Sequence, residues 1–224
     1  MRLVNVSYNI DIEFAENCTE IISIEGPDIY TEFIQELNSQ LDGEAGNFVL
    51  SEKNDTLKMD KKVEFIFNPF GVDFNEKRII SKAYNVLKDS AEGLDELREK
   101  INSSIVNILD EVILRSPYDN FVYNLDLDWN TLFKLYDVRV QFEEGKLVDK
   151  LIQYIKMLAE LLGIRVIFLL NISTFLTKYE LQELCKSAQY EKVNLVLLEQ
   201  RELELTDVKS RSHIIDCDRC LIIK

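Results

Sequence analysis

The chain has 224 residues, of which 46% are hydrophobic and 29% charged, which is typical of a globular protein with a sizeable core. Its three prolines and seven glycines are scattered, and no apolar run reaches the length of a membrane span, which excludes disordered and membrane-spanning classes. The net charge of -14, taken for the whole chain, argues against nucleic-acid binding. The charge is unevenly distributed, however: residues 1–50 carry ten acidic and one basic side chain, whereas residues 130–165 carry five acidic and six basic side chains. A locally positive surface is therefore allowed.

The amino-terminal part predicts strands and one helix. Met1–Asn5 alternates polar and apolar residues without the apolar region of a signal peptide, so we expect a cytoplasmic protein. Residues 3–6 and 10–14 predict a strand pair, and residues 20–24 a buried strand. After a turn, Asp28 is expected to cap a helix over residues 29–41. Residues 48–50 and 63–67 predict further strands, separated by a basic, polar segment.

The middle of the chain is mostly helical in pattern. Apolar spacing predicts helices over residues 75–90 and about 94–112. Residues 123–128 are expected to be extended, with Asp128 capping a short helix that ends near Tyr136. Residues 138–142 alternate like a strand, and residues 146–162 predict a helix with a broad apolar face.

The last quarter is typical of a parallel βαβ unit. The runs 166–170 and 195–198 are uninterrupted apolar stretches of strand length, with room for a crossover helix between them. Such a unit implies an α/β sheet covered on both faces. Asn171, Ser173, Glu199 and Arg201 should lie just beyond the strand ends, where open α/β sheets usually bind ligands.

These elements suggest a discontinuous α/β head with a helical insertion. We expect the head to comprise residues 1–70 and 163–224, and the helical extension residues 71–162. The layout is that of nucleotide-binding folds, but Glu25 and Asp28 stand where a phosphate loop would present amides and a lysine. Two carboxylates would repel a triphosphate, so we expect neither nucleotide binding nor hydrolysis.

Cysteine and histidine usage restricts the chemistry further. Four irregularly spaced cysteines are too few for a disulfide framework, so we expect free thiols. Cys217 and Cys220 have metal-knuckle spacing, but no second pair exists, and we interpret them as half-buried strand thiols. The single histidine, His213, is expected at the surface, which makes catalytic triads and His-rich metal centres hard to assemble.

An acidic segment offers candidate metal ligands. Residues two apart in an extended segment share a face, so Asn124, Asp126 and Asp128 can converge on a hard cation, with Asp119 or Glu111 added from the adjoining turn. The alternative is a solvated loop in which Asp128 only caps a helix. If a metal binds, calcium is expected.

Basic residues form two groups along the chain. The groups comprise Lys53, Lys58, Lys61 and Lys62, then Lys134, Arg139, Lys146, Lys150 and Lys156. No arginine cluster or interleaved aromatic residues suggest base reading, so any nucleic-acid contact should be to the phosphates of a duplex. Scattered surface lysines are the alternative interpretation.

The carboxyl-terminal motifs resemble a known family. The strand ending in Asn171, the string Phe175-Leu-Thr-Lys178 with Glu180-Leu181, and Leu195–Glu199 followed by Arg201-Glu202-Leu203 resemble the short accessory adaptation protein of type II-A CRISPR systems. The similar length, the acidic segment at 124–128 and Val-Arg-Val at 138–140 agree with this resemblance.

The resemblance implies a P-loop-NTPase-like α/β head without a Walker A motif, plus an inserted helical leg, in a ring-shaped homotetramer. It implies a non-enzymatic protein that threads double-stranded DNA, binds calcium and assists spacer acquisition with the CRISPR integrase and effector nuclease. By this resemblance, Lys134 and Arg139 are the preferred DNA contacts, with Lys58, Lys61 and Lys62 as a second group. The calcium ligands would be Asp126 and Asp128, with Glu111, Asp119 and Asn124 as further candidates.

Two alternatives stay open. Asp119, Asp126 and Asp128 could hold magnesium in a metal-dependent nuclease or phosphoesterase, which paired carboxylates can support. A degenerate nucleotide sensor is the third hypothesis. DNA cleavage or ATP binding would separate these from a DNA clamp.

Overall fold

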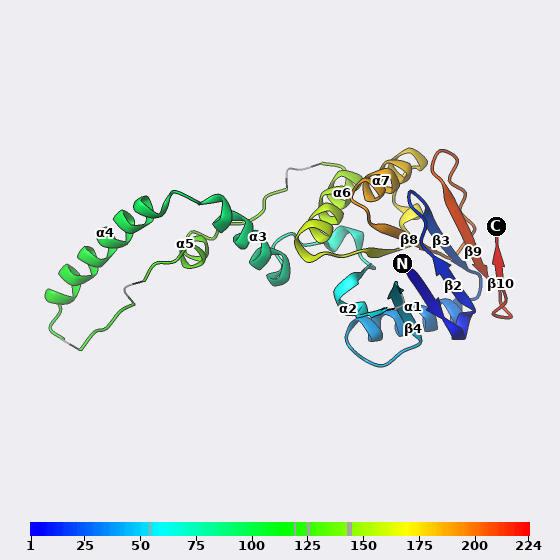
Figure 1. Ribbon diagram of the computed structural model, residues 1–224, viewed down its shortest axis with the longest axis horizontal. Helices are drawn as coiled ribbons and strands as arrows, with labels where there is room; N and C mark the ends of the chain where they lie inside the picture. Colours follow the sequence, from blue (N-terminus) through cyan, green and yellow to red (C-terminus); the bar gives the residue numbers. More distant parts are fainter. Residues whose placement is uncertain (54, 119, 125, 143–144) are drawn as a thin grey trace. The chain divides into compact units, whose positions relative to one another are not determined.

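The computed structural model describes residues 1–53, 55–118, 120–124, 126–142 and 145–224. These residues form two compact units (Figure 1). Unit 1 comprises Met1–Phe74 and Phe142–Lys224, and unit 2 comprises Asn75–Gln141.

A six-stranded sheet forms the centre of unit 1. Its strands are β3 (Thr19–Ile24), β6 (Val63–Ile66), β7 (Val166–Leu170), β8 (Asn194–Glu199), β9 (Ser210–Ile215) and β10 (Leu221–Ile223), in the order β10-β9-β3-β8-β7-β6. All neighbours are parallel except β9 and β10. The predicted mixed α/β class with a mostly parallel sheet is confirmed.

The predicted βαβ unit is present. β7 and β8 are parallel neighbours, and α7 (Lys178–Tyr190) connects them after the short turn η4 (Ile172–Thr174). α7 begins with a capping box, in which Thr177 Oγ1 accepts the Glu180 N–H and the Glu180 carboxylate accepts the Thr177 N–H. Uninterrupted apolar runs are typical of strands covered on both faces, which explains why this unit was readable from sequence.

A second sheet is antiparallel and was not anticipated. It contains β1 (Arg2–Asn5), β2 (Ile10–Glu13), β4 (Phe48–Glu52) and β5 (Asp55–Leu57) in the order β2-β1-β4-β5, with the turn η1 (Val6–Tyr8) between β1 and β2. The predicted strand pair at 3–14 is confirmed by β1 and β2. The basic segment after β4 forms β5 and α2 (Met59–Lys62), which leads directly into β6.

α1 (Pro27–Leu41) links the two sheets. Phe33 and Leu37 on this helix are fully buried in one core cluster with Leu3 and Leu50 of the second sheet and Phe168 of the parallel sheet. Asp28 lies inside the first turn, so its predicted role as N-cap is wrong. Gly26 takes that position without a side-chain hydrogen bond.

Other helices of unit 1 lie beside α7. α6 (Leu147–Met157) contacts α7 and continues into the π-helical turn η3 (Leu158–Leu162), where Gly163 ends the helix in the left-handed region at φ 66°. Val196 and Leu198 of β8 belong to the core cluster that contains Phe33 and Leu37 of α1. Leu195 and Leu197 alternate with them along the strand, so β8 presents buried apolar residues on both faces. The turn η2 (Pro69–Gly71) follows β6.

The described residues of unit 2 (75–118, 120–124 and 126–141) contain three helices and their connections. They are α3 (Lys77–Ser90), α4 (Asp95–Leu114) and α5 (Trp129–Leu135). The Tyr84 and Phe133 rings pack at a centroid distance of 5.4 Å. The strand predicted at 138–142 is absent there; instead Val140 exchanges two hydrogen bonds with the Asn75 side chain, at 2.8 and 2.9 Å.

The limits of unit 2 differ from the extension expected at 71–162. α6 and η3 belong to unit 1 because Leu151 and Ile155 on α6 are buried, and because Phe74 packs against Tyr154. Among the helices of the described ranges, none combines the length and apolar character that a membrane crossing requires.

Candidate nucleic-acid interface

A buried carboxylate lies at the carboxyl ends of β7 and β8. Glu199, the last residue of β8, is 3% exposed, and it accepts the Ser173 N–H at 3.0 Å and the Ser173 hydroxyl at 2.7 Å. Burial raises the pKa of Glu199, and the two hydrogen bonds from Ser173 oppose that shift. The structure therefore brings these two predicted residues together, bonded to each other.

The other two residues predicted at this edge take different roles. Asn171 follows β7 in the left-handed region, at φ 47°, and its N–H donates to the Leu198 carbonyl at 2.9 Å. Arg201 is exposed, and its backbone carbonyl accepts the Ser23 hydroxyl at 3.1 Å. Both residues thus shape the strand ends through their backbones.

The connection between β3 and α1 is unsuited to phosphate. It has only two residues, Glu25 and Gly26, and α1 begins with Pro27, which has no N–H. Asp28 adds a negative charge in the first turn. A helix N-terminus attracts phosphate through free N–H groups and the positive end of its dipole, and this one lacks a donor and carries a carboxylate.

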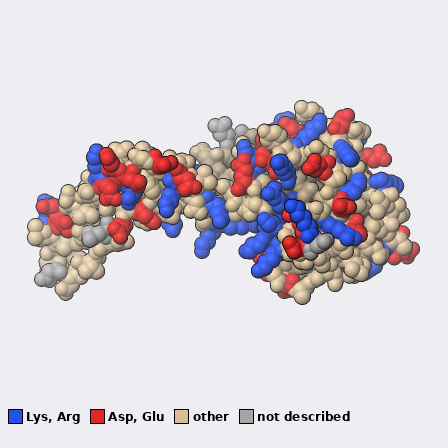
Figure 2. Space-filling model, viewed as in Figure 1, with Lys and Arg blue, Asp and Glu red and all other residues tan. Residues whose placement is uncertain are grey.

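Three predicted DNA-contacting lysines lie at α2 in unit 1. Lys58 and Lys61 are exposed, and the Lys61 Nζ lies 3.4 Å from the Asp60 carboxylate. Lys62 is half-buried, and its Nζ donates to the Gly163 carbonyl at 3.3 Å. Figure 2 shows basic side chains gathered over this part of unit 1. Lys58 and Lys61 therefore offer the more accessible charges, while Lys62 also holds α2 in place.

The other predicted DNA contacts lie in unit 2. Lys134 is exposed in the last turn of α5, and the exposed Arg139 pairs with the Asp137 carboxylate at 2.6 Å. The predicted basic positions are therefore divided between the two units.

Asp128 acts as a helix cap. Its Oδ1 accepts the Thr131 N–H at 2.6 Å, as the sequence predicted. The hydrogen bonds from Thr131, aided by the charges of Lys134 and Lys88, hold the pKa of Asp128 below its usual range. One lone pair of this carboxylate is thus already used by the backbone.

The other described metal-ligand candidates make separate local contacts. Asn124 Oδ1 accepts the Asp126 N–H at 3.1 Å, and Glu111 pairs with Arg115 at 3.0 Å. Asp119 lies outside the described residues. Within the described ranges, no group of three His, Cys, Asp or Glu side chains is placed to hold a metal ion. The described carboxylates at 111, 126 and 128 are therefore not arranged as a ready-made metal site.

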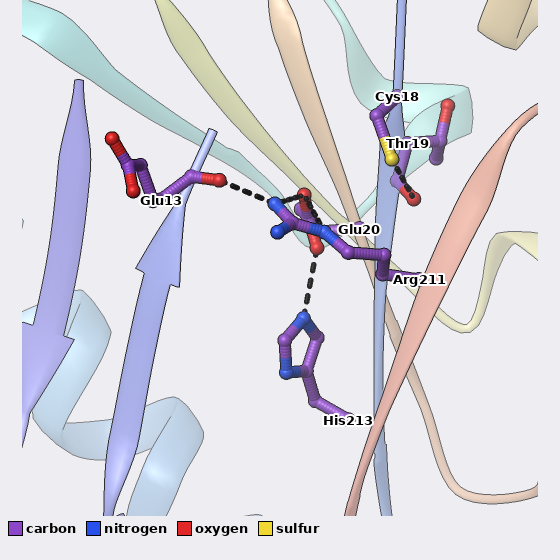
Figure 3. Close-up of polar contacts among 6 residues, drawn as sticks. All are labelled: Glu13, Cys18, Thr19, Glu20, Arg211 and His213. Carbon is purple, nitrogen blue, oxygen red and sulfur yellow. Dashed lines mark hydrogen bonds and ion pairs between the residues drawn. The ribbon is translucent and has the colours of Figure 1, made fainter. Parts of the chain in front are cut away.

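Sequence reasoning missed a buried polar cluster that links three strands (Figure 3). Glu20 on β3 is fully buried, and its Oε2 lies 2.8 Å from His213 Nε2 on β9. The Arg211 guanidinium donates to Glu20 Oε1, through Nε at 3.1 Å and through Nη2, and also to the Glu13 carbonyl at the end of β2. The cluster thus ties the two sheets together.

The prediction that His213 is a surface residue was wrong, since it is only 2% exposed. β9 is an inner strand of the sheet, and the His213 ring turns toward the buried Glu20 carboxylate of the neighbouring β3. An acidic residue directly before the mostly apolar residues 21–24 was the available signal, because a charge in a buried strand requires a partner.

The interpretation of Cys217 and Cys220 as half-buried strand thiols was also wrong. Both are exposed in the turn between β9 and β10, because Asp216 Oδ1 accepts the N–H groups of Asp218 and Cys220, at 2.9 and 2.8 Å, and ends the strand. All four cysteines, each within the described ranges, are free thiols. Burial raises the pKa of the Cys185 thiol to about 11.

No curated protein matches the chain. The crystal structure of Stu0660 of Streptococcus thermophilus is similar at a TM-score of 0.63 and 18% sequence identity, covering 96% of this chain and 74% of that one. At this identity the likeness concerns the fold. The family model described as CRISPR-associated protein (Cas_Csn2) matches residues 40–219, well over half of the sequence, and confirms the resemblance to a type II-A CRISPR accessory protein. The chain therefore belongs to the Cas_Csn2 family of CRISPR-associated proteins.

Proposed function

We propose that this protein is a non-catalytic, sequence-independent binder of double-stranded DNA that assists CRISPR spacer acquisition in the cytoplasm. It would act as a ring of four copies, together with the integrase proteins and the effector nuclease. Each copy would contribute a head related to P-loop proteins and a helical leg, and the duplex would thread through the ring over a free end.

The exposed lysines at α2 are the observation that carries this proposal. A chain with a net charge of -14 repels DNA as a whole, so binding requires basic side chains that are locally concentrated. Lys58 and Lys61 supply such a site in unit 1, and symmetry would multiply it around the axis of a ring. Lys134 and Arg139 would add contacts from unit 2.

The first turn of α1 supports the proposal that the protein does not hydrolyse nucleotides. Pro27 and Asp28 remove the amide donor and the positive field that a nucleotide phosphate would use. Calcium binding stays a proposal from family resemblance alone. A calorimetric titration that detects no heat of calcium binding would contradict this part of the proposal.

Binding should be tested by fluorescence anisotropy with two labelled duplexes of unrelated sequence over a range of salt concentrations. We expect equal affinities for the two, falling steeply with salt because each neutralised phosphate releases counterions. Lys58→Glu combined with Lys61→Glu should abolish binding at moderate salt. The matched control, Lys178→Glu with Lys186→Glu on α7, changes the net charge equally and should bind nearly as well as the wild type.

Threading predicts a further difference. Linear duplex should bind, whereas the same duplex with both ends blocked should not, so equal binding to both would contradict a ring. Cleavage of either duplex with magnesium, abolished by Asp126→Asn, would instead favour the nuclease hypothesis.

A further inference from the structure

The turn that joins β9 to β10 carries two exposed thiols. Its loop is Cys217–Arg219, and Cys220 begins the return toward β10. Cys217 and Cys220 are exposed, whereas Cys18 and Cys185 are buried. The two accessible sulfurs therefore belong to one Cys-X-X-Cys sequence, a spacing found in dithiols that are oxidised and reduced reversibly.

The backbone of this turn keeps the two cysteines close. The Asp216 N–H donates to the Cys220 carbonyl at 3.1 Å, so these residues face each other at the base of the hairpin, and Cys217 directly follows Asp216. Arg219 closes the loop in the left-handed region, at φ 62°, as three-residue hairpin loops usually do. Residues three apart across such a reversal have Cα atoms within about 7 Å, and a disulfide joins Cα atoms about 4.4–6.8 Å apart. A bond between the two sulfurs therefore requires little backbone movement.

Side chains of the loop fix its conformation. Asp216 Oδ1 accepts the N–H groups of Asp218 and Cys220, at 2.9 and 2.8 Å. The Cys220 Sγ lies 4.0 Å from the Asp218 carbonyl oxygen, so this sulfur is turned back over the loop that contains Cys217. The Cys220 thiol is thus directed toward its neighbour in the turn.

The turn is also attached to the rest of unit 1. The Arg219 guanidinium pairs with the Glu32 carboxylate of α1 at 2.5 Å. It also lies over the Tyr8 ring, 6.0 Å from the ring centroid. Because the loop is already held in place, joining its sulfurs does not have to order a mobile segment.

Metal binding is the other chemistry that a pair of thiols suggests. A structural zinc site needs four ligands. In the part of the chain that the structure describes, no third His, Cys, Asp or Glu side chain is placed to complete a metal site with this pair. Oxidation to a disulfide needs only the two sulfurs, so the arrangement favours redox chemistry.

We propose that Cys217 and Cys220 form a redox-sensitive pair, which small-molecule disulfides oxidise to an internal disulfide. One thiolate attacks the small disulfide, forms a mixed disulfide and releases one small thiolate. The second cysteine thiolate then attacks the protein sulfur of the mixed disulfide and releases the other small thiolate. The two cysteines thereby lose two electrons and two protons, which leave with two small thiols. Exposed disulfides are readily reduced, so an excess of small thiol reverses the reaction.

The test uses the full chain incubated with oxidised glutathione, followed by alkylation of the remaining thiols and intact mass measurement. The wild type should become lighter by two hydrogens, its free thiols should fall from four to two, and reduced glutathione in excess should restore all four. Cys217→Ser and Cys220→Ser should each retain one bound glutathione, because the thiol that would displace it is missing. Cys185→Ser, at a buried position, is the matched control and should form the same internal disulfide as the wild type.

Two Asp216 variants test the role of the turn. Both Asp216→Ala and Asp216→Asn remove the charge, but only the asparagine keeps an oxygen that can accept the two N–H groups. In glutathione redox buffers, the equilibrium constant for the internal disulfide should be about three- to tenfold lower for Asp216→Ala than for Asp216→Asn. Two retained glutathiones on the wild type, disulfide-linked copies in place of an internal bond, or equal constants for the two Asp216 variants would overturn the proposal.

Discussion

Glu20→Gln tests whether the buried cluster of Glu20, Arg211 and His213 holds unit 1 together. Glu20 is fully buried and the His213 side chain is 3% exposed, so neither can turn to water when the carboxylate is replaced. The amide keeps the volume but removes the charge that both partners face. Breaking a buried charged pair by removing one partner costs about 3–5 kcal/mol.

The lower end of that range applies here. The Arg211 side chain is 35% exposed, so its guanidinium can regain water after the substitution. We therefore expect a loss of about 3 kcal/mol in the free energy of unfolding. For a chain of this size that corresponds to a fall in melting temperature of about 6–12 °C.

The assay must report on unit 1. The single tryptophan, Trp129, lies in unit 2, so its fluorescence follows that unit, whereas urea unfolding followed by far-ultraviolet circular dichroism includes the strands of unit 1. Glu32→Gln is the matched control, because Glu32 pairs with Arg219 at the surface and should cost less than about 1 kcal/mol. If Glu20→Gln lost no more stability than Glu32→Gln, the reasoning would be refuted.

Three further substitutions probe local features of the fold. Burial raises the pKa of Glu199, so the protein should lose stability as pH rises from the unfolded-state pKa of this carboxyl through its raised folded-state pKa. Glu199→Gln should flatten this pH dependence of the urea midpoint, measured from about pH 4 to 8. An unchanged profile would contradict the prediction. Thr177→Ala removes the capping box of α7 and should lower the free energy of unfolding by about 1 kcal/mol, measured by thermal denaturation, with Thr56→Ala at an exposed strand position as the control. Asp128→Ala removes the cap of α5 and should destabilise unit 2 by about 1 kcal/mol in urea unfolding followed by Trp129 fluorescence. Since the pKa of Asp128 is lowered, its contribution to stability should be present above the unfolded-state pKa and lost as pH falls through the folded-state pKa. If Asp128→Ala were as stable as the wild type at neutral pH, the cap would contribute nothing.

Local patterns explain which predictions succeeded. The runs 166–170 and 195–198 indicated a parallel βαβ unit because a strand covered on both faces must be apolar throughout. The helix cap at Asp128 was predictable from sequence because its hydrogen-bond partner is Thr131, only three residues away. Such features depend on neighbours in the chain, so the sequence contains their cause.

The candidate site was predictable only in part. Residue type and family resemblance placed Lys58 and Lys61 among the DNA contacts, and both are exposed. The role of Lys62 in holding the Gly163 carbonyl was not predictable, because 101 residues separate the two. These lysines belong to unit 1 and Lys134 and Arg139 to unit 2, and this division likewise depends on the tertiary structure.

The amino-acid sequence alone determined the α/β class, the helix and strand periodicities and the unsuitability of the α1 start for phosphate. Tertiary structure decided that β1, β2, β4 and β5 form a sheet of their own, and that His213 is buried against Glu20. The physical reason is the distance along the chain over which each interaction acts. Periodicity and capping act over a few residues, whereas strand order and the partner of a buried charge depend on segments nearly two hundred residues apart.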